Sequence, residues 1–226
     1  KELDLYDEKQ VDEYIISNKI DIIVHTANRG GDRAYENDHN IVEYNLRIFF
    51  NLMKHEKKVK KIISFGSGAE YSKNKPIVDA KEDDSCNCLP LDEYGFYKSV
   101  TSKFISKSDN IVQLRVFGCY GEYENYLFKF ISNAIVKNIY KLPIVINKNI
   151  FFDYTYVDDI IKMVDYFVNN DFNKKIYNAS SGKKIDLITL AKYVNESSDF
   201  KSEIIILNAG LNDEYTSNNE KILSEL

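Results

Sequence analysis

The residues best suited to chemistry lie at the two ends of the segment from Lys61 to Lys98. The segment opens with Lys61-Ile62-Ile63-Ser64-Phe65, an apolar run typical of a buried strand, which breaks at Gly66-Ser67-Gly68. It closes at Tyr94-Gly95-Phe96-Tyr97-Lys98, where a helical pattern begins. A hydroxyl, a phenol and an amine in this arrangement predict proton transfer to or from an alcohol oxygen while a cofactor carries the hydride.

The spacing Tyr-x-x-x-Lys occurs twice, and its surroundings separate the two occurrences. Lys75 precedes Pro76, and a residue before proline is pushed out of the helical region, so Tyr71 and Lys75 are not expected to share a helix face. Tyr94 and Lys98 stand four residues apart in a helical pattern, which places both side chains on one face. We therefore expect the second pair to be the functional one.

This chemistry needs three side chains together. A free tyrosine has a pKa of about 10 and is too weak a base at neutral pH. A lysine ammonium one helical turn away favours the phenolate, and a serine hydroxyl orients the alcohol or carbonyl. The pattern predicts Tyr94 as acid/base, Lys98 as its electrostatic partner and Ser67 as the group that polarises the substrate oxygen. Taken alone, Tyr94 and Lys98 would be an ordinary helix pair and Ser67 a turn serine.

Strands and helices alternate along the chain, which is typical of an α/β fold with a doubly wound, parallel, Rossmann-like sheet. Asp92 is the expected N-cap of the helix that holds Tyr94, and Asp158 and Asp159 are expected to complement a later helix dipole. The predicted helices are Val11–Asn18, Ile41–Glu56, Tyr94–Ser106, Leu127–Val136, Val157–Asn169 and Leu187–Asn195. The predicted strands are Ile20–His25, Lys61–Phe65, Ile111–Val116, Ile144–Phe152, Ile176–Asn178 and Glu203–Leu207.

The order of elements predicts two parts. Residues 1–116 form part of a dinucleotide-binding domain. Residues 117–226 form a smaller, mostly substrate-binding part, from which Ile144–Asn169 is expected to return to the sheet. No Gly-x-Gly-x-x-Gly turn occurs in the sequence, so no phosphate cradle at a helix N-terminus is visible. The chain resembles a doubly wound sheet entered at its third strand.

Composition narrows the class of protein. With 226 residues, 44% hydrophobic and 29% charged, the chain is an ordinary globular one, and its net charge of −5 gives no reason to expect a nucleic-acid partner. No apolar run reaches membrane-spanning length and no signal peptide is visible, so no membrane partner is expected. Three cysteines favour a reducing compartment, and Cys86-x-Cys88 lacks further ligands at metal-binding spacing, so no metal is expected.

Several segments in a fixed order resemble the extended short-chain dehydrogenase/reductases, which include nucleotide-sugar epimerases, dehydratases and reductases. Ser67, four residues before Tyr71, matches the catalytic hydroxyl of that family, and Tyr94 and Lys98 match its catalytic pair. The other matching segments are Asp4-Leu5, Val24-His25-Thr26-Ala27, Asn45, Leu114-Arg115-Val116-Phe117, Tyr120-Gly121, Tyr156-Val157-Asp158-Asp159 and Tyr177-Asn178-Ala179-Ser180-Ser181-Gly182. Relative to family members, roughly the first strand–helix–strand and part of the C-terminal end are missing.

This resemblance implies NAD or NADP as cofactor and a nucleotide-diphosphate sugar as substrate. Its catalytic residues are Ser67, Tyr94 and Lys98. It also implies a cytoplasmic homodimer, joined through the helices Ile41–Glu56 and Tyr94–Ser106, that serves polysaccharide synthesis. The residue that selects NAD or NADP follows a strand that this sequence does not contain. The residues that the resemblance assigns to cofactor binding are Asp4, Leu5, Thr26, Ala27, Asn28, Asn45, Lys98, Val116 and Phe117.

Departures from family patterns reduce the number of reactions that the sequence allows. Sugar 4,6-dehydratases have an Asp-Glu pair directly after the catalytic hydroxyl, where this chain has Gly68-Ala69 and places Glu70 one position late. GDP-fucose synthases have a cysteine at the place of Ala69 and a histidine within the segment Glu122–Lys129, and this chain has neither. Dehydration and 3,5-epimerisation are therefore not expected.

Two reactions need only serine, tyrosine, lysine and cofactor: reduction of a 4-keto sugar nucleotide, and 4-epimerisation through a transient ketose. UDP-galactose 4-epimerases bind the diphosphate with an asparagine and an arginine, where this chain has Gly118 and Phe152. The run from Gly66 to Tyr71 is more similar to reductases of deoxysugar synthesis. The sequence therefore favours a 4-keto-sugar reductase. A 4-epimerase is the alternative, and a non-catalytic or truncated sugar-nucleotide-binding fragment is the second.

Overall fold

A computed structural model describes residues 3–31, 39–87 and 89–226, so Cys88 of the Cys86-x-Cys88 pair lies outside the described residues. Each helix predicted from the sequence is present, with ends shifted by a few residues. The helices are α1 Glu8–Asn18, α2 Ile41–Met53, α3 Glu93–Ile105, α4 Phe130–Ile139, α5 Val157–Asn169, α6 Leu187–Glu196 and α7 Glu220–Leu223. Short 3-10 helices are η2 Glu56–Lys58, η3 Gly68–Tyr71 and η4 Glu82–Asn87.

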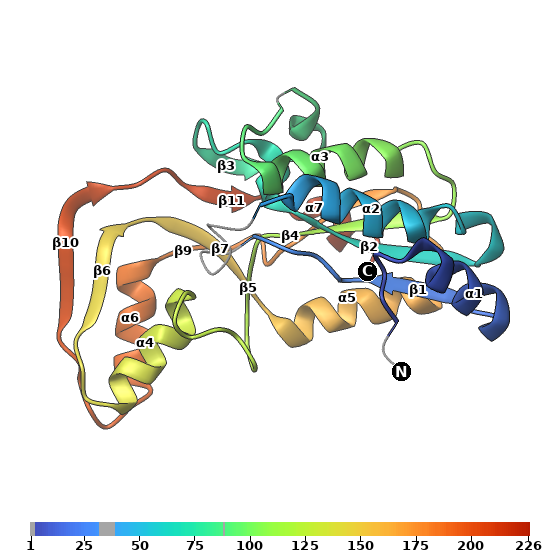
Figure 1. Cartoon of the computed structure of the whole chain (residues 1–226). Coiled ribbons are helices and arrows are strands. Elements are labelled where there is room, and N and C mark those ends of the chain that lie inside the picture. The colour runs from blue at the N-terminus through green and yellow to red at the C-terminus, as the bar shows by residue number, and fades with distance from the viewer. Residues whose placement is uncertain (1–2, 32–38, 88) are drawn as a thin grey trace.

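Four parallel strands form the central sheet in the order β1-β2-β4-β8. They are β1 Ile22–His25, β2 Lys61–Ser67, β4 Ile111–Val116 and β8 Ile176–Ala179. Helices α2 and α3 lie on one side of this sheet and α5 on the other, which confirms the predicted Rossmann-like α/β arrangement (Figure 1). Because the strands are parallel, their carboxyl ends meet at one edge, where Ser67 pairs with Val116 and Val116 with Ala179.

Strands β2 and β4 of the central sheet are buried on both faces, which explains why they read as continuous apolar runs. Neighbouring residues of β2 point to opposite faces: Ile62 joins the core with Phe49 of α2, and Ile63 joins the core with Phe167 of α5. Both isoleucines are fully buried. The two helical layers therefore fix the register of β2, and with it the place where Ser67 emerges.

The remaining strands form a second part beside this sheet (Figure 1). Its core joins helices α4 and α6 to strand β6. Strand β6 pairs with β10, while β3, β11, β7 and β5 form another sheet that β9 extends through β7. The strands are β3 Ile77–Ala80, β5 Gly118–Tyr120, β6 Ile144–Asn149, β7 Phe151–Tyr156, β9 Lys184–Asp186, β10 Ile204–Leu211 and β11 Tyr215–Ser217.

The expected return of Ile144–Asn169 to the central sheet holds only for its helix. α5 packs Ile160 and Phe167 against the central sheet, whereas the predicted strand Ile144–Phe152 divides into β6 and β7, which pair elsewhere. Both strands have partners of their own: β6 bonds to β10, and β7 bonds to β5, β9 and β11. None of the helices in the described ranges has the length and apolarity needed to cross a membrane.

Candidate active site

Ser67 is the last residue of β2 and the N-cap of η3. Its Oγ accepts a hydrogen bond from the backbone N–H of Ala69 at 3.1 Å, and its own N–H donates to Glu70 Oε1 at 3.0 Å. These two bonds form a capping box, which satisfies backbone donors where the strand turns into the short helix. The side chain is therefore held at the carboxyl edge of the sheet, as the sequence predicts.

Tyr94 and Lys98 occupy the first turns of α3. Asp92 caps this helix, since its Oδ1 accepts the N–H of Gly95 at 2.8 Å, which confirms the predicted N-cap. A Cβ at Gly95 would lie 2.8 Å from the carbonyl oxygen of Ala69, so the absence of a side chain lets α3 approach η3 closely. This approach brings the start of the helix against the residues that follow Ser67.

The structure brings the three predicted catalytic side chains together. The Ser67 hydroxyl lies near enough to the phenol of Tyr94 to act on its pKa, which it lowers. Lys98 Nζ lies 5.7 Å from the centre of the Tyr94 ring and donates to the carbonyl oxygen of Phe65 at 2.5 Å. All three lie where β2 ends and α3 begins. Their arrangement can hold a substrate oxygen between a hydroxyl and a phenol, beside an amine.

Burial governs the protonation of this group. Desolvation raises the pKa of Tyr94 to about 12, and Ser67 opposes this rise while the charge of Glu70 adds to it. Desolvation lowers the pKa of Lys98 to about 8, partly offset by Glu70. The sequence predicted that Lys98 makes the phenol acidic. In this structure desolvation outweighs any such effect, and Tyr94 is a neutral phenol at pH 7.

Tyr215 of β11 is a second phenol at this place, and the sequence analysis missed it. The Ser67 hydroxyl acts to lower the pKa of this phenol, as it does for Tyr94. A Cβ at Gly68 would lie only 2.3 Å from Tyr215 Oη, so this phenol reaches the site only because position 68 has no side chain. No local pattern marks Tyr215 as a site residue, because it belongs to a three-residue strand far along the chain.

The loop after β1 covers Tyr94 from the other side. Gly31 has a φ of +98°, and a Cβ there would lie 2.6 Å from Cε2 of Tyr94. Asn45 of α2 holds this loop: it accepts the N–H of Arg29 and donates to the Arg29 carbonyl, both at 2.8 Å. The predicted cofactor residues Thr26, Ala27 and Asn28 lie in this exposed loop, at the same edge of the sheet as Ser67.

The other predicted cofactor residues divide into two places. Val116 pairs with Ser67 in the sheet, and the Phe117 ring packs 5.0 Å from the ring of Tyr215, so both lie at the site. Asp4 and Leu5 lie before α1. The Asp4 carboxylate accepts the N–H of Tyr6, and Leu5 packs against the core on the α2 side of the sheet.

His25 ends β1 beside this group. Desolvation lowers its pKa to about 4, with a smaller contribution from the charge of Lys98, so the ring is neutral at pH 7. Its Nδ1 is buried and has no hydrogen-bond partner within the part of the chain that the structure describes. A neutral, desolvated ring next to an ammonium adds no charge to the site.

A parallel sheet with covered faces, and a serine, a tyrosine and a lysine at its carboxyl edge, define a Rossmann-like protein of the short-chain dehydrogenase/reductase class. Residues 1–180 match the NAD dependent epimerase/dehydratase family, and the chain belongs to that family.

Two curated relatives share its sequence at a low level. An uncharacterised protein of Methanocaldococcus jannaschii is 24% identical over 214 residues, which cover 88% of this chain and 64% of that protein. ADP-L-glycero-D-manno-heptose-6-epimerase of Brachyspira hyodysenteriae is 24% identical over 202 residues, covering 81% and 61%. The chain thus spans less than two thirds of either relative.

Solved structures share the fold. UDP-glucose 4-epimerase of Thermotoga maritima superposes with a TM-score of 0.84 at 18% identity, covering 99% of this chain and 76% of that one. GDP-mannoheptose C4 reductase of Campylobacter jejuni, solved with NADP bound, gives 0.81 at 20% identity and covers 99% and 81%. At such identities the likeness establishes the fold and not the reaction.

Proposed function

We propose that this chain is an NAD(P)-dependent oxidoreductase that reduces a 4-keto sugar carried on a nucleoside diphosphate. The observation that supports the proposal most is the convergence of Ser67, Tyr94 and Lys98 where β2 ends and α3 begins, at the carboxyl edge of a parallel sheet. Acid/base transfer at a carbinol oxygen needs these three groups and a hydride carrier.

The direction of the pKa shifts favours reduction. A neutral Tyr94, with its pKa raised to about 12, is placed to donate its proton to the oxygen that becomes an alcohol. Ser67 donates a hydrogen bond to the same oxygen and polarises the carbonyl. A bound NADPH or NADH would supply the hydride for the carbonyl carbon. Lys98, protonated below a pKa of about 8, balances the negative charge left on the phenolate.

The residues present fit one half of such a cofactor. The ammonium of Lys98 has three donors, of which the Phe65 carbonyl takes one, and the others suit ribose hydroxyls. Val116 and Phe117, with the Thr26–Asn28 loop, border the same edge of the sheet. For the pyrophosphate, the printed sequence offers no glycine-rich turn at a helix N-terminus. We therefore assign the nicotinamide and ribose, and not the phosphates, to these residues.

Glu70 supports reduction over dehydration. A dehydratase needs a free acid and base beyond the tyrosine, and Glu70 is the carboxylate nearest in sequence to Ser67. It is fully buried and accepts hydrogen bonds from Ser67 N, Gln113 Nε2 and Arg115 Nε. Both of its oxygens are thus occupied by buried donors of the protein. The C4 reductase of Campylobacter jejuni shares the fold, as do 4-epimerases, so 4-epimerisation stays the second candidate.

The experiment uses this chain with NADPH and NADH. Isothermal titration is expected to show binding of at least one of them, and absence of binding would leave the fragment interpretation. Addition of a 4-keto sugar nucleotide should then consume NADPH, followed by the loss of its absorbance. Conversion of a 4-hydroxy sugar nucleotide to its epimer without net NADPH consumption would favour the epimerase. The variants Tyr94→Phe and Ser67→Ala should abolish or strongly reduce either reaction.

We also propose a homodimer through α2 and α3. These helices lie side by side on the outer face of the molecule (Figure 1). Phe50 of α2 and Phe104 of α3 are partly exposed there, with ring centres 5.3 Å apart. Light scattering should give twice the mass of the chain, and the double variant Phe50→Glu/Phe104→Glu should give the monomer mass with the fold intact. A monomeric wild-type chain would refute the dimer.

A further inference from the structure

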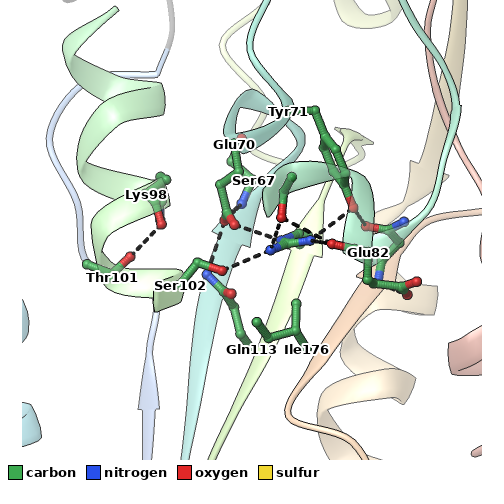
Figure 2. Close-up of polar contacts among 12 residues, drawn as sticks. Ser67, Glu70, Tyr71, Glu82, Lys98, Thr101, Ser102, Gln113 and Ile176 are labelled. Carbon is green, nitrogen blue, oxygen red and sulfur yellow. Dashed lines mark hydrogen bonds and ion pairs between the residues drawn. The ribbon is translucent and has the colours of Figure 1, made fainter. Parts of the chain in front are cut away.

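A buried ion pair lies directly behind Ser67. Glu70 is 0% exposed and Arg115 is 2% exposed, and Arg115 Nε donates to Glu70 Oε2 at 2.7 Å. The other oxygen of Glu70 accepts the backbone N–H of Ser67 at 3.0 Å and Gln113 Nε2 at 3.1 Å. Figure 2 shows Glu70 between Ser67 and the polar groups on its other side. One carboxylate therefore connects the catalytic strand end to a buried cation.

Arg115 in turn connects the elements around the site. Its Nη1 donates to Tyr71 Oη at 3.0 Å and to the carbonyl oxygen of Glu82 at 2.7 Å. Its Nη2 donates to Ser85 Oγ at 2.8 Å and to Ser102 Oγ at 2.9 Å. These partners lie on η3, η4 and α3 (Figure 2). The guanidinium thus joins the helix of Tyr94 and Lys98 to the strand end of Ser67.

Stability alone does not account for this pair. Removing two charges from water costs several kcal/mol per ion, and apolar groups of similar size are often as stable or more so. Hydrophobic residues fill the neighbouring positions of the same strands, such as Ile63 and Leu114. A buried pair at this position therefore points to a role in geometry and charge.

We propose that the Glu70–Arg115 pair positions Ser67 for catalysis and sets the charge environment of Tyr94. Glu70 fixes the backbone at Ser67, so that the hydroxyl faces the phenol, and Arg115 holds the Glu70 carboxylate in this orientation. Both are positioning residues, since they act through Ser67 and Tyr94. This inference rests on the proposed proton transfer and adds the groups that tune it.

The electrostatic part follows from what surrounds Tyr94. Glu70 and Ser67 face it from η3 and the end of β2, and Tyr215 faces it from β11. Within the part of the chain that the structure describes, further charged or titratable neighbours come from its own segment: Asp92, Tyr97 and Lys98. Glu70 raises the pKa of both Tyr94 and Lys98. Loss of its charge should therefore move both titrations to lower pH.

The first test is a double-mutant cycle between Glu70 and Ser67. Glu70→Gln keeps the shape and an acceptor for the Ser67 N–H but removes the charge; we expect kcat to fall roughly tenfold, with KM changed less than twofold. Since Glu70 positions Ser67, Glu70→Gln should slow the Ser67→Ala variant by a smaller factor than it slows the wild type, and the effect that remains is that of its charge on Tyr94. Multiplicative losses would overturn the positioning role.

A matched control separates this role from general loss of stability. Asp12 of α1 is also a paired carboxylate. It accepts hydrogen bonds from Lys54 at 2.6 Å and from His55 at 2.7 Å, two residues that follow α2. Asp12→Asn should lower the free energy of unfolding and leave kcat unchanged. If Glu70→Gln fails to fold because Arg115 is left unpaired, Glu70→Gln/Arg115→Met removes both charges and takes its place in the cycle.

The second test does not need turnover. In the chain labelled with ¹³C at tyrosine Cζ, the Tyr94 signal is assigned by its loss in Tyr94→Phe and followed with pH. Wild-type Tyr94 should titrate near its pKa of about 12, and Glu70→Gln should titrate at clearly lower pH. An unchanged titration would refute the electrostatic part. If the wild type shows no turnover, the proposed function fails, while this titration still decides the effect of Glu70.

Discussion

Burial of the Lys98 ammonium lowers the stability of the folded chain, and a substitution of Lys98 should show this effect. Its side chain is 5% exposed, and desolvation lowers its pKa from 10.5 to about 8. Below pH 8 the folded chain must keep a buried ammonium whose carbonyl partner is Phe65. A lowered pKa in the folded state means that Lys98 binds its proton less tightly in the folded chain than in the unfolded chain. The variant Lys98→Met should therefore be more stable than the wild type at neutral pH.

The magnitude follows from the two pKa values. A difference of 10.5 − 8 = 2.5 units corresponds to about 3 kcal/mol of destabilisation at pH 7. The variant also loses the hydrogen bond to the Phe65 carbonyl, which costs it about 1 kcal/mol. Its free energy of unfolding should therefore exceed that of the wild type by about 2 kcal/mol. Between pH 8 and 10.5 the unfolded chain binds more protons than the folded one, so wild-type stability rises through this range. The advantage of the variant should disappear by about pH 10.

The assay is urea unfolding at pH 7 and pH 10. Because the chain contains no tryptophan, circular dichroism and tyrosine fluorescence are the suitable signals. Lys61→Met is the matched control, since Lys61 is also buried on β2 but donates to two carbonyl oxygens, of Phe167 and Asn170. That control should lose stability at both pH values. A Lys98→Met variant that is less stable at pH 7, or a gap that does not change with pH, would refute the reasoning.

Three further outcomes test the geometry. Asp92→Ala removes the N-cap of α3 and should cost about 1 kcal/mol in urea unfolding, with a lower kcat because Tyr94 lies in the first turn; an unchanged stability would count against the cap. Gly68→Ala should lower the free energy of unfolding by about 1–3 kcal/mol, since its Cβ would lie 2.3 Å from Tyr215 Oη. The double variant Gly68→Ala/Tyr215→Phe should recover part of this loss, because the phenol oxygen is gone. Fully additive losses would contradict the contact. Tyr215→Phe alone should reduce kcat in the NADPH assay while circular dichroism stays unchanged, and wild-type kinetics would show that this phenol takes no part.

The central sheet could be predicted from sequence because its signals are local. Runs such as Ile62-Ile63 and Ile111-Val112 are apolar at every position, since one residue faces α2 and the next faces α5. Such runs identify strands covered on both sides without any knowledge of their partners. The approach of Ser67 to the helix of Tyr94 and Lys98 was predictable for the same reason. The strand ends at Gly66-Ser67-Gly68 and the helix begins at its N-cap Asp92, and both signals are local.

The second part was harder because its strands depend on distant partners. β11 has three residues and pairs with β3 and β7, and nothing local distinguishes it from a loop. Tyr215 therefore could not be placed at the site beforehand. From the sequence, Glu70 differs from dehydratases only in standing one position late. Its ion pair could not be predicted, since its partner Arg115 is 45 residues away. Contacts of this separation leave no periodic pattern in a sequence.

The electrostatics of the site could not be predicted from residue types, and the reason bears on function. The sequence gives the charge of Lys98 but not its solvation, so it predicts an acidic phenol where the structure has a neutral one. In the structure, burial acts on both members of the pair, bringing the phenol to about 12 and the amine to about 8. A neutral phenol beside an ammonium is the form that can give a proton to an oxygen and keep the resulting phenolate stable. The same burial that destabilises the chain at Lys98 therefore prepares Tyr94 as an acid, and a variant selected for stability alone should replace Lys98 and lose the reaction.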